Sequence, residues 1–395
     1  MGGSLTPPPP RSVKDLPTDI MISVLERLSL ADRVRFASSC SSFYSIFRAA
    51  QRLRPPKTPP WMLLPSQSTP AAITFFSVSN RRIYRIPQKA EDEEESCRCR
   101  RHRRRLLFLG SSDGWLVTLD QGHSQLDLLN PITGAKIHLP PLPSSKLVPL
   151  ESSKAILSFT SSSASSSPFS FYTVVLLLAR YSNSSAWPTA LVCCSSQRAW
   201  TPFGRREFYS DAAITSSNII YTMQSNGTVE AWDLSSSSGG GPSLSATIVM
   251  PKSLSTGFAS FTKYLVMAGG GLLQVWRSRE FAKVEFKVFE LEAKEEEEEE
   301  WVEVKSLGGR VVFLNSCCSS MSMMPEDCPP ELAGASNSIY FNCLTTTSSS
   351  KNRESMVFRM EDGSVASVLL HGSIWEPSPI WIAPTLLGTD CSGGR

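Results

Sequence analysis

The sequence predicts an α+β multidomain protein, in which a small three-helix domain precedes an all-β propeller of six or seven blades. Three observations carry this prediction. Helical periodicity is confined to a stretch from Asp15 to about Ala50. Beyond Trp61 the chain consists of short strand-like runs separated by Gly, Asn, Asp and Ser, without alternating helices. Turn glycines also recur at intervals that fit a repeat of about 45 residues.

The helical stretch reads DLPTDIMISVLERLSLADRVRFASSCSSFYSIF. Pro17 suits the first turn of a helix, Ser29 or Asp32 can open a second helix, and Ser41 or Ser42 a third. Three short helices cannot bury all the apolar surface of this stretch by themselves. The excess predicts docking onto the helices of another protein, or packing as a cap on the chain's own propeller. The stripe on the first helix comprises Ile20, Met21, Val24, Leu25 and Leu28.

Four turn segments carry the β repeat when they are aligned on Gly114, Gly227, Gly271 and Gly363. Each segment combines a hairpin-turn signal with an alternating strand. The last two intervals fit one blade and two blades, and the first fits two blades plus an insertion near Ser161–Ser167. A propeller would protect the edges of so many antiparallel strands. A large β-sandwich, which has similar turn spacing, is the alternative.

Changes in composition along the chain predict its domain boundaries. Two charge runs and a serine-rich stretch interrupt the strand pattern and read as insertions. The predicted order is a disordered Pro-rich leader at 1–14, the helical domain at 15–50, a Pro-rich linker at 51–60, the propeller at 61–385 with low-complexity insertions near 88–105, 160–168 and 293–300, and a C-terminal tail at 386–395.

Overall composition indicates a folded protein without a strong general attraction to phosphate. The 39 Lys and Arg residues nearly balance 36 Asp and Glu, for a net charge of +3, and 41% of residues are hydrophobic. Three close pairs among the ten cysteines indicate reduced thiols in the cytoplasm and/or nucleus. The longest apolar run, Val174–Ala179, is too short to span a bilayer, so we expect no transmembrane segment. Gly2 and Thr6 fit a myristoylation pattern, which we attribute to chance because no second anchor is present.

The sequence contains no arrangement of residues that is typical of a catalytic, cofactor or metal site. The Cys97–Cys99 segment lacks the spacing and partner pair of a zinc site, and neither G-x-S-x-G nor a phosphate-binding loop is present. Three aspartates belong to or flank turn sequences, where Asp stabilises the backbone: Asp113, Asp233 and Asp362. The histidines are scattered, at His102, His123, His138 and His371. We therefore expect a non-catalytic protein with no cofactor.

A basic run at Arg98–Arg105 offers an alternative function. Its arginines could contact phosphates or act as a nuclear localisation signal. No aromatic residues interleave the run, and the acidic Glu91–Glu95 directly upstream would partly neutralise it. We favour a solvated insertion and keep a nucleic-acid-associated propeller protein as the alternative.

Two tryptophans near the C-terminus, Trp375 and Trp381, are separated by prolines. They could line a recognition surface. We favour their use as anchors of a terminal strand that closes the propeller.

The helical stretch resembles the F-box motif. About 35 residues carry the resemblance, and the sequence departs from the motif where Phe43 replaces the usual Trp and Ser39 the usual Val. The matching residues are Leu16, Pro17, Asp19, Ile20, Met21, Ile22, Val24, Leu25, Leu28, Asp32, Arg35 and Cys40.

The rest of the chain is similar to plant F-box proteins with a C-terminal KIB-type β-propeller. The similarity covers most of residues 61–385. It is carried by GSSDGWLVTLD, LDLLNPITGAKIHLPPL, NGTVEAWDL, FKVFELE with WVEVKSLGGRVVFL, and MEDGSVASVL with IWEPSPIWIAP.

These resemblances imply a substrate-recognition subunit of an SCF-type ubiquitin ligase complex. The F-box would bind the Skp-type adaptor and so the cullin, while the propeller would bind an unknown client protein for ubiquitination and proteasomal degradation. No catalytic residue would be needed, because the subunit acts by tethering. The implied adaptor-binding residues are Leu16, Pro17, Ile20, Met21, Val24, Leu25 and Leu28.

Overall fold

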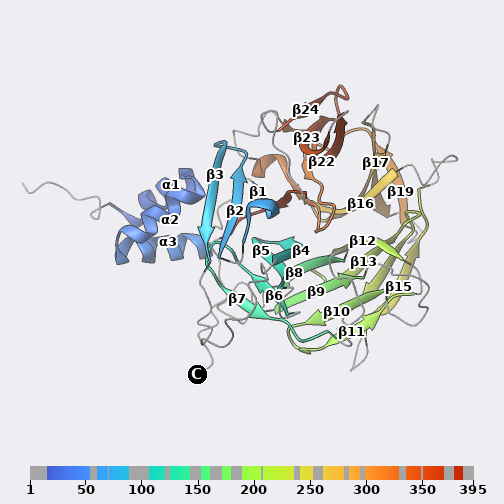
Figure 1. Ribbon diagram of the computed structural model, residues 1–395, viewed down its shortest axis with the longest axis horizontal. Helices are drawn as coiled ribbons and strands as arrows, with labels where there is room; N and C mark the ends of the chain where they lie inside the picture. The colour runs from blue at the N-terminus through green and yellow to red at the C-terminus, as the bar shows by residue number, and fades with distance from the viewer. Residues whose placement is uncertain are drawn as a thin grey trace, which may run out of the picture. The chain divides into compact units, whose positions relative to one another are not determined.

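The chain divides into two compact units, Met1–Thr58 and Pro59–Arg395. Figure 1 shows helices in the first unit and strands arranged around an axis in the second. This computed structural model describes residues 16–53, 60–69, 71–88, 106–120, 125–142, 153–160, 171–178, 189–205, 208–234, 241–251, 261–279, 284–293, 299–328, 335–347, 350–368 and 378–385.

The first unit contains helices α1 (Thr18–Arg27), α2 (Leu30–Ser39) and α3 (Ser41–Leu53). Ser29 caps α2, since its side chain accepts a hydrogen bond from the backbone N–H of Asp32 at 3.2 Å. Helix α3 continues three residues beyond the predicted end of the helical domain, into the predicted linker. Gln, Arg and Leu at 51–53 are good helix formers, and the first proline comes only at Pro55.

The second unit is a six-bladed β-propeller within the described residues. Six blades lie within the predicted range of six or seven. Blades one to three consist of β25 (Ile380–Ile382), β1 (Trp61–Leu63), β2 (Ala72–Ser77) and β3 (Arg82–Pro87); β4 (Leu106–Ser112), β5 (Trp115–Asp120), β6 (Gln125–Leu129) and β7 (Lys136–His138); and β8 (Lys154–Thr160), β9 (Phe171–Leu177), β10 (Ala190–Cys194) and β11 (Trp200–Phe203).

Blades four and five repeat the same antiparallel pattern, whereas blade six differs. In blade six β20 pairs in parallel with β22, so that Val311 lies opposite Ser338, and β21 is added on the other side of β20. The strands of these blades are β12 (Tyr209–Ile214), β13 (Ile219–Gln224), β14 (Val229–Asp233) and β15 (Ser243–Ile248); β16 (Phe261–Ala268), β17 (Gly271–Ser278), β18 (Phe286–Ala293) and β19 (Glu299–Val304); and β20 (Val311–Phe313), β21 (Met321–Met323), β22 (Ser338–Thr347), β23 (Ser350–Arg359) and β24 (Val365–Ser367).

The propeller is closed by strands from opposite ends of its sequence. Strand β25 pairs antiparallel with β1, and Trp381 lies opposite Met62. The Trp381 side chain is fully buried and packs against Phe313 of blade six, with 5.1 Å between the two ring centroids. This placement agrees with the interpretation of Trp381 as an anchor of the closing strand, while Trp375 lies outside the described residues.

The glycines used to recognise the repeat do not occupy equivalent positions in the blades. Gly114 lies between the first two strands of its blade and Gly271 begins the second strand of its own, but Gly227 lies between the second and third strands and Gly363 between the last two. The alignment on these glycines was therefore wrong, although the propeller that it supported is present. A tight hairpin turn needs a residue with positive φ wherever it occurs in a blade, as Gly227 shows with a φ of 100°.

The predicted acidic insertion near 293–300 is shorter than expected at its C-terminal end. Glu299 and Glu300 belong to β19, where Glu300 lies opposite Glu292. The strand extends into the charged run because alternate residues of an outer strand face solvent and tolerate charge. Residues 294–298 lie outside the described residues, as do the predicted insertions near 88–105 and 160–168 apart from Gln88 and Thr160.

Candidate functional site

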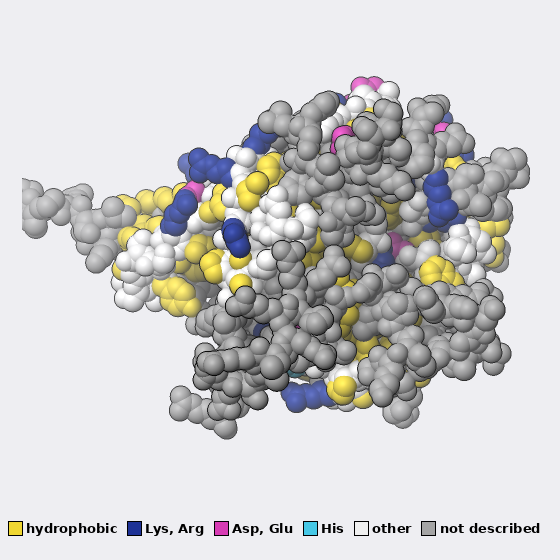
Figure 2. Space-filling model, in the orientation of Figure 1, with side chains coloured by type: hydrophobic (Ala, Val, Ile, Leu, Met, Phe, Trp, Pro, Cys, Tyr) yellow, Lys and Arg dark blue, Asp and Glu magenta, His cyan; other side chains and the backbone are white. Residues whose placement is uncertain are grey.

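An exposed apolar face marks the helical unit. Ile20 and Val24 lie one turn apart on α1, with 50% and 41% of their surface exposed. Figure 2 shows hydrophobic side chains at the surface of the helices. The other large exposed apolar side chains of this unit are Leu16, Val34 and Tyr44.

The seven residues predicted to contact an adaptor divide into two sets. Leu16, Pro17, Ile20 and Val24 are exposed and lie together at the start and along one face of α1. In contrast, Met21 and Leu25 are only 2% and 3% exposed, and Leu28 is half-buried. Met21 and Leu25 also lie one turn apart, so α1 has a buried stripe directly beside its exposed stripe.

The junction of α1 and α2 is held by a buried arginine. Arg33 on α2 donates from Nε to the carbonyl oxygen of Leu25 at 2.8 Å and from Nη2 to that of Glu26 at 3.0 Å. Both carbonyl groups lie in the last turn of α1, where the helix offers no N–H four residues on, and that of Leu25 also accepts the backbone N–H of Leu28 at 3.2 Å. Arg33 therefore fixes the end of α1, and with it the direction in which Ile20 and Val24 point.

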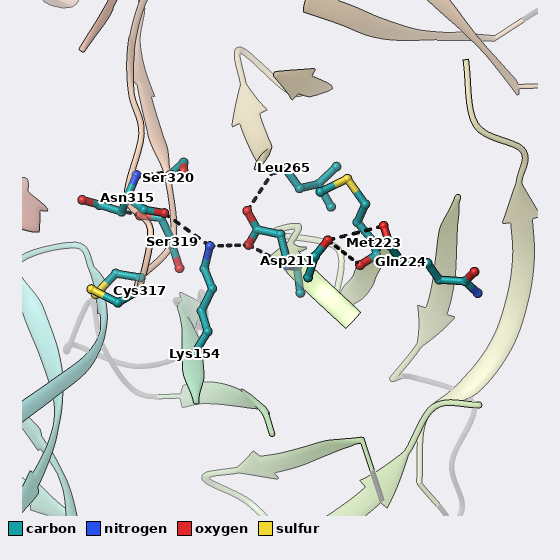
Figure 3. Close-up of polar contacts among 12 residues, drawn as sticks. Lys154, Asp211, Met223, Gln224, Leu265, Asn315, Cys317, Ser319 and Ser320 are labelled. Carbon is teal, nitrogen blue, oxygen red and sulfur yellow. Dashed lines mark hydrogen bonds and ion pairs between the residues drawn. The ribbon is translucent and has the colours of Figure 1, made fainter. Parts of the chain in front are cut away.

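The inner strands of the propeller surround a polar cluster, shown in Figure 3. Lys154 of β8 forms an ion pair with Asp211 of β12 at 2.6 Å, and both side chains are buried. Asp211 also accepts backbone N–H groups of Leu265 at 3.0 Å and Ala212 at 2.8 Å. Burial raises the pKa of Asp211, and the Lys154 ammonium partly offsets this effect. The pair joins blades three, four and five.

A segment of blade six reaches across the axis to blade three, on the opposite side of the ring. Cys318 forms a parallel bridge with Ala155 of β8, and the carbonyl of Asn315 accepts from Lys154 Nζ at 3.5 Å. The Asn315 side chain accepts a hydrogen bond from the backbone N–H of Trp381 at 2.8 Å and donates one to the backbone carbonyl of Trp381 at 3.1 Å. Asn315 thus connects the closing strand to the central ion pair, and the cluster serves to hold blades together.

Other candidate residues have structural partners or lie elsewhere. His138 Nδ1 is 2.7 Å from Asp127, which also pairs with Lys136 at 3.1 Å. Asp113 and Asp362 lie in hairpin turns, and Asp362 accepts from the backbone N–H of Ser364. The part of the chain that the structure describes contains no group of three or more His, Cys, Asp or Glu side chains able to hold a metal ion. The remaining histidines, Cys97, Cys99 and Arg98–Arg105 fall outside it.

Two family models match the chain. The KIB1-4 beta-propeller model covers residues 75–362, and the F-box domain model covers residues 13–54. The chain belongs to the KIB1-4 beta-propeller family. An F-box domain therefore precedes a KIB1-4 propeller, as the resemblances implied.

Curated relatives of this KIB1-4 protein are F-box proteins of Arabidopsis thaliana. Putative F-box protein At5g66830 is 29% identical over 147 residues, which cover 35% of this chain and 36% of that protein. F-box protein At5g25290 is 31% identical over 132 residues, 33% of this chain and 29% of that protein. The chain thus spans about a third of the length of the curated relatives it matches. A solved luciferin-regenerating enzyme aligns with 60% of this chain and 70% of its own at 8% identity and a TM-score of 0.33.

Sequence reasoning about the F-box missed two exposed apolar residues of the helical unit of this KIB1-4 protein. Tyr44 on α3 is 51% exposed and Val34 on α2 is 41% exposed, and neither was among the predicted contact residues. Helical periodicity could have suggested both, because Val34 lies one turn before Ser38 and Tyr44 one turn before Arg48, on polar sides of their helices. No helix in the described ranges is long and apolar enough to cross a membrane.

Proposed function

We propose that this protein is the substrate-recognition subunit of an SCF-type ubiquitin ligase. The F-box helices bind the Skp-type adaptor, which links the protein to the cullin. The propeller binds a client protein for ubiquitination and proteasomal degradation. The observation that carries the proposal is the exposed apolar face of α1, formed by Leu16, Ile20 and Val24 on an F-box domain.

The size of this face supports helix docking. Covering Ile20, Val24 and Leu16, each with 41% to 50% of its surface exposed, would contribute about 1 kcal/mol per side chain. The neighbouring Met21 and Leu25 are already buried and supply the scaffold of the face. We therefore assign direct adaptor contact to the exposed set, and support of α1 to Met21, Leu25 and Leu28.

The contribution of such a subunit to the reaction is effective concentration. Holding a client lysine near a loaded conjugating enzyme turns a second encounter into an intramolecular step. This role requires two binding surfaces and no catalytic group in the chain. We accordingly propose a non-catalytic subunit that acts in the cytoplasm and/or nucleus.

Co-purification of the full chain with a Skp-type adaptor tests the proposal. We expect Ile20→Glu with Val24→Glu to weaken adaptor binding at least about tenfold, because a charge would be desolvated at each contact. Ile83→Glu is the matched control, since Ile83 is 58% exposed on the outer strand β3 of the propeller. Its adaptor binding should equal that of the native protein.

Circular dichroism of each variant shows whether its helices remain folded. Leu25→Asp is unsuitable as an interface probe, because a charge at a buried position would disrupt the helical unit itself. Adaptor binding that survives the double change in α1, with native helix content, would refute the assigned docking face. Failure of the native chain to bind any Skp-type adaptor would refute the ligase role.

A further inference from the structure

Two arginines lie at the open end of the β16–β17 hairpin in blade five. The two strands are labelled in Figure 1. Arg277 lies opposite Thr262, and directly opposed residues of an antiparallel pair share a face. Arg279 follows two residues later and is exposed. Its Nε donates to Thr262 Oγ1 at 3.3 Å. The two arginines therefore lie on the face of the sheet that carries Thr262.

Blade six holds Arg277 in place. Arg277 Nη1 donates to the carbonyl oxygen of Asn342 at 2.6 Å, and the guanidinium carbon lies 5.6 Å from the centroid of the Phe341 ring. The Asn342 side chain is itself fixed, because it donates to the Pro379 carbonyl at 2.8 Å and accepts from Ser355 Oγ at 2.6 Å. Arg277 is thus pre-organised by a rigid neighbour and an aromatic surface.

Donor capacity remains on both guanidinium groups. Arg277 Nε is buried and has no hydrogen-bond partner in the structure. Across the described ranges, no carboxylate lies within ion-pair distance of Arg277 or Arg279. A buried donor without an acceptor is costly, and a guanidinium offers five N–H groups in a planar fork. An oxyanion is the ligand that accepts from such a fork.

The described acidic residues of the same sheet form no ion pair with either arginine, and Glu290 of β18 pairs instead with Arg310 at 2.9 Å. Glu285 precedes Phe286, which is directly opposite Arg277, so Glu285 occupies the other face of the sheet. The acidic residues at 299–300 lie at the far end of the β18–β19 hairpin, roughly 24 Å along the strand from Phe286. Glu354 is on β23 of blade six and forms no ion pair with either arginine. Within the described residues, no carboxylate therefore pairs with Arg277 or Arg279, while Glu280, which follows Arg279, lies outside them.

We propose that Arg277 and Arg279 form an anion site that binds a carboxylate or phosphoryl group on a peptide segment of the client protein. This inference rests on the proposed function, because it names the chemistry of the client that the propeller receives. Arg277 supplies the fixed, partly buried contact, and Arg279 closes over the anion from the solvent side. Phe341 is fully buried, so it supports the Arg277 guanidinium and does not contact the bound group.

Fluorescence anisotropy with three labelled peptides tests the site on the full chain. The probes are hexaglutamate, hexaglutamine and a hexapeptide in which phosphoserine alternates with glycine. Hexaglutamate binding identifies a carboxylate, binding of the phosphoserine peptide alone identifies a phosphoryl group, and either result supports the site. We expect Arg277→Gln and Arg279→Gln each to weaken binding of the preferred peptide at least about tenfold.

Arg82→Gln is the matched control, because Arg82 is an exposed arginine on β3 of a different blade. Equal weakening by Arg82→Gln would indicate general charge attraction and overturn the inference, as would a native protein that binds neither anionic peptide. The exposed Arg279 can be changed without disturbing packing, so Arg279→Gln tests the site even if Arg277→Gln unfolds. The same variants should co-purify with the adaptor as well as the native protein does. A failure of the anion site is therefore distinguishable from a failure of the proposed ligase role.

Discussion

At the scale of single residues, the ion pair between Lys154 and Asp211 links charge most directly to the stability of the fold. Both side chains are buried near the axis, and Asp211 is fully enclosed. Breaking a buried pair from one side leaves an uncompensated charge. We expect Lys154→Met to lower the free energy of unfolding by about 3–5 kcal/mol. Chemical denaturation measures this change. Lys154→Met with Asp211→Asn should recover only part of it, since Asn removes the buried charge but its single Oδ1 can accept only one of the two backbone N–H groups.

The loss of unfolding free energy caused by Lys154→Met should become larger as the pH rises. Burial raises the pKa of Asp211 above its ordinary value even with Lys154 present, and loss of the ammonium raises it further. The native state then holds a proton that the unfolded state has lost, so stability falls as pH rises from about 4 through the raised pKa. Unfolding at pH 5 and pH 8 should show the larger deficit at pH 8. Equal deficits at both values would mean that Asp211 does not carry the effect.

At the scale of the element, the three-residue strand β25 closes the ring. Its central residue, Trp381, is fully buried, and its backbone is held by Asn315 and by Ser111 Oγ at 3.2 Å. We expect Trp381→Ala to destabilise the propeller by about 3–5 kcal/mol, because it removes a large buried ring beside Phe313. Chemical denaturation followed by tryptophan fluorescence measures the loss. A change below about 1 kcal/mol would show that the ring is closed by other contacts.

Helix α1 illustrates how neighbouring stripes of one element take different roles. Ile20 and Val24 remain exposed, while Met21 and Leu25 are buried. A rotation of about 100° per residue separates the two stripes. Apolar character alone therefore cannot tell a docking residue from a core residue in this helix.

At the scale of the whole molecule, the helical unit and the propeller are separate compact units. We expect a chain that begins at Pro59 to keep the thermal transition of the propeller within about 2 °C, because its core is formed by its own strands. The same chain should lose all adaptor binding. Differential scanning calorimetry of both forms makes the comparison. A much lower transition in the shorter chain would support the alternative in which the helices act as a cap on the propeller.

Much of the fold could be predicted from local patterns. The apolar stripe of α1 and the Ser29 cap predicted the first two helices, and alternation with hairpin turns predicted the strands. The exact repeat could not be predicted, because glycine marks any turn that needs positive φ. The parallel pairing of β20 with β22 in blade six also left no local signal. Pairing partners are chosen by packing against the rest of the sheet.

The sequence by itself determined the helical and β-rich parts, the family motifs and the residues from which an adaptor face can be built. Periodicity and turn chemistry are local properties, so they can be read along the chain. Only the tertiary structure decided which apolar residues of α1 are exposed, that Lys154 meets Asp211, and that Arg277 is held by Asn342 across two blades. The two contacts within the propeller join positions 57 or more residues apart, and they exist only once the blades have packed into a closed ring.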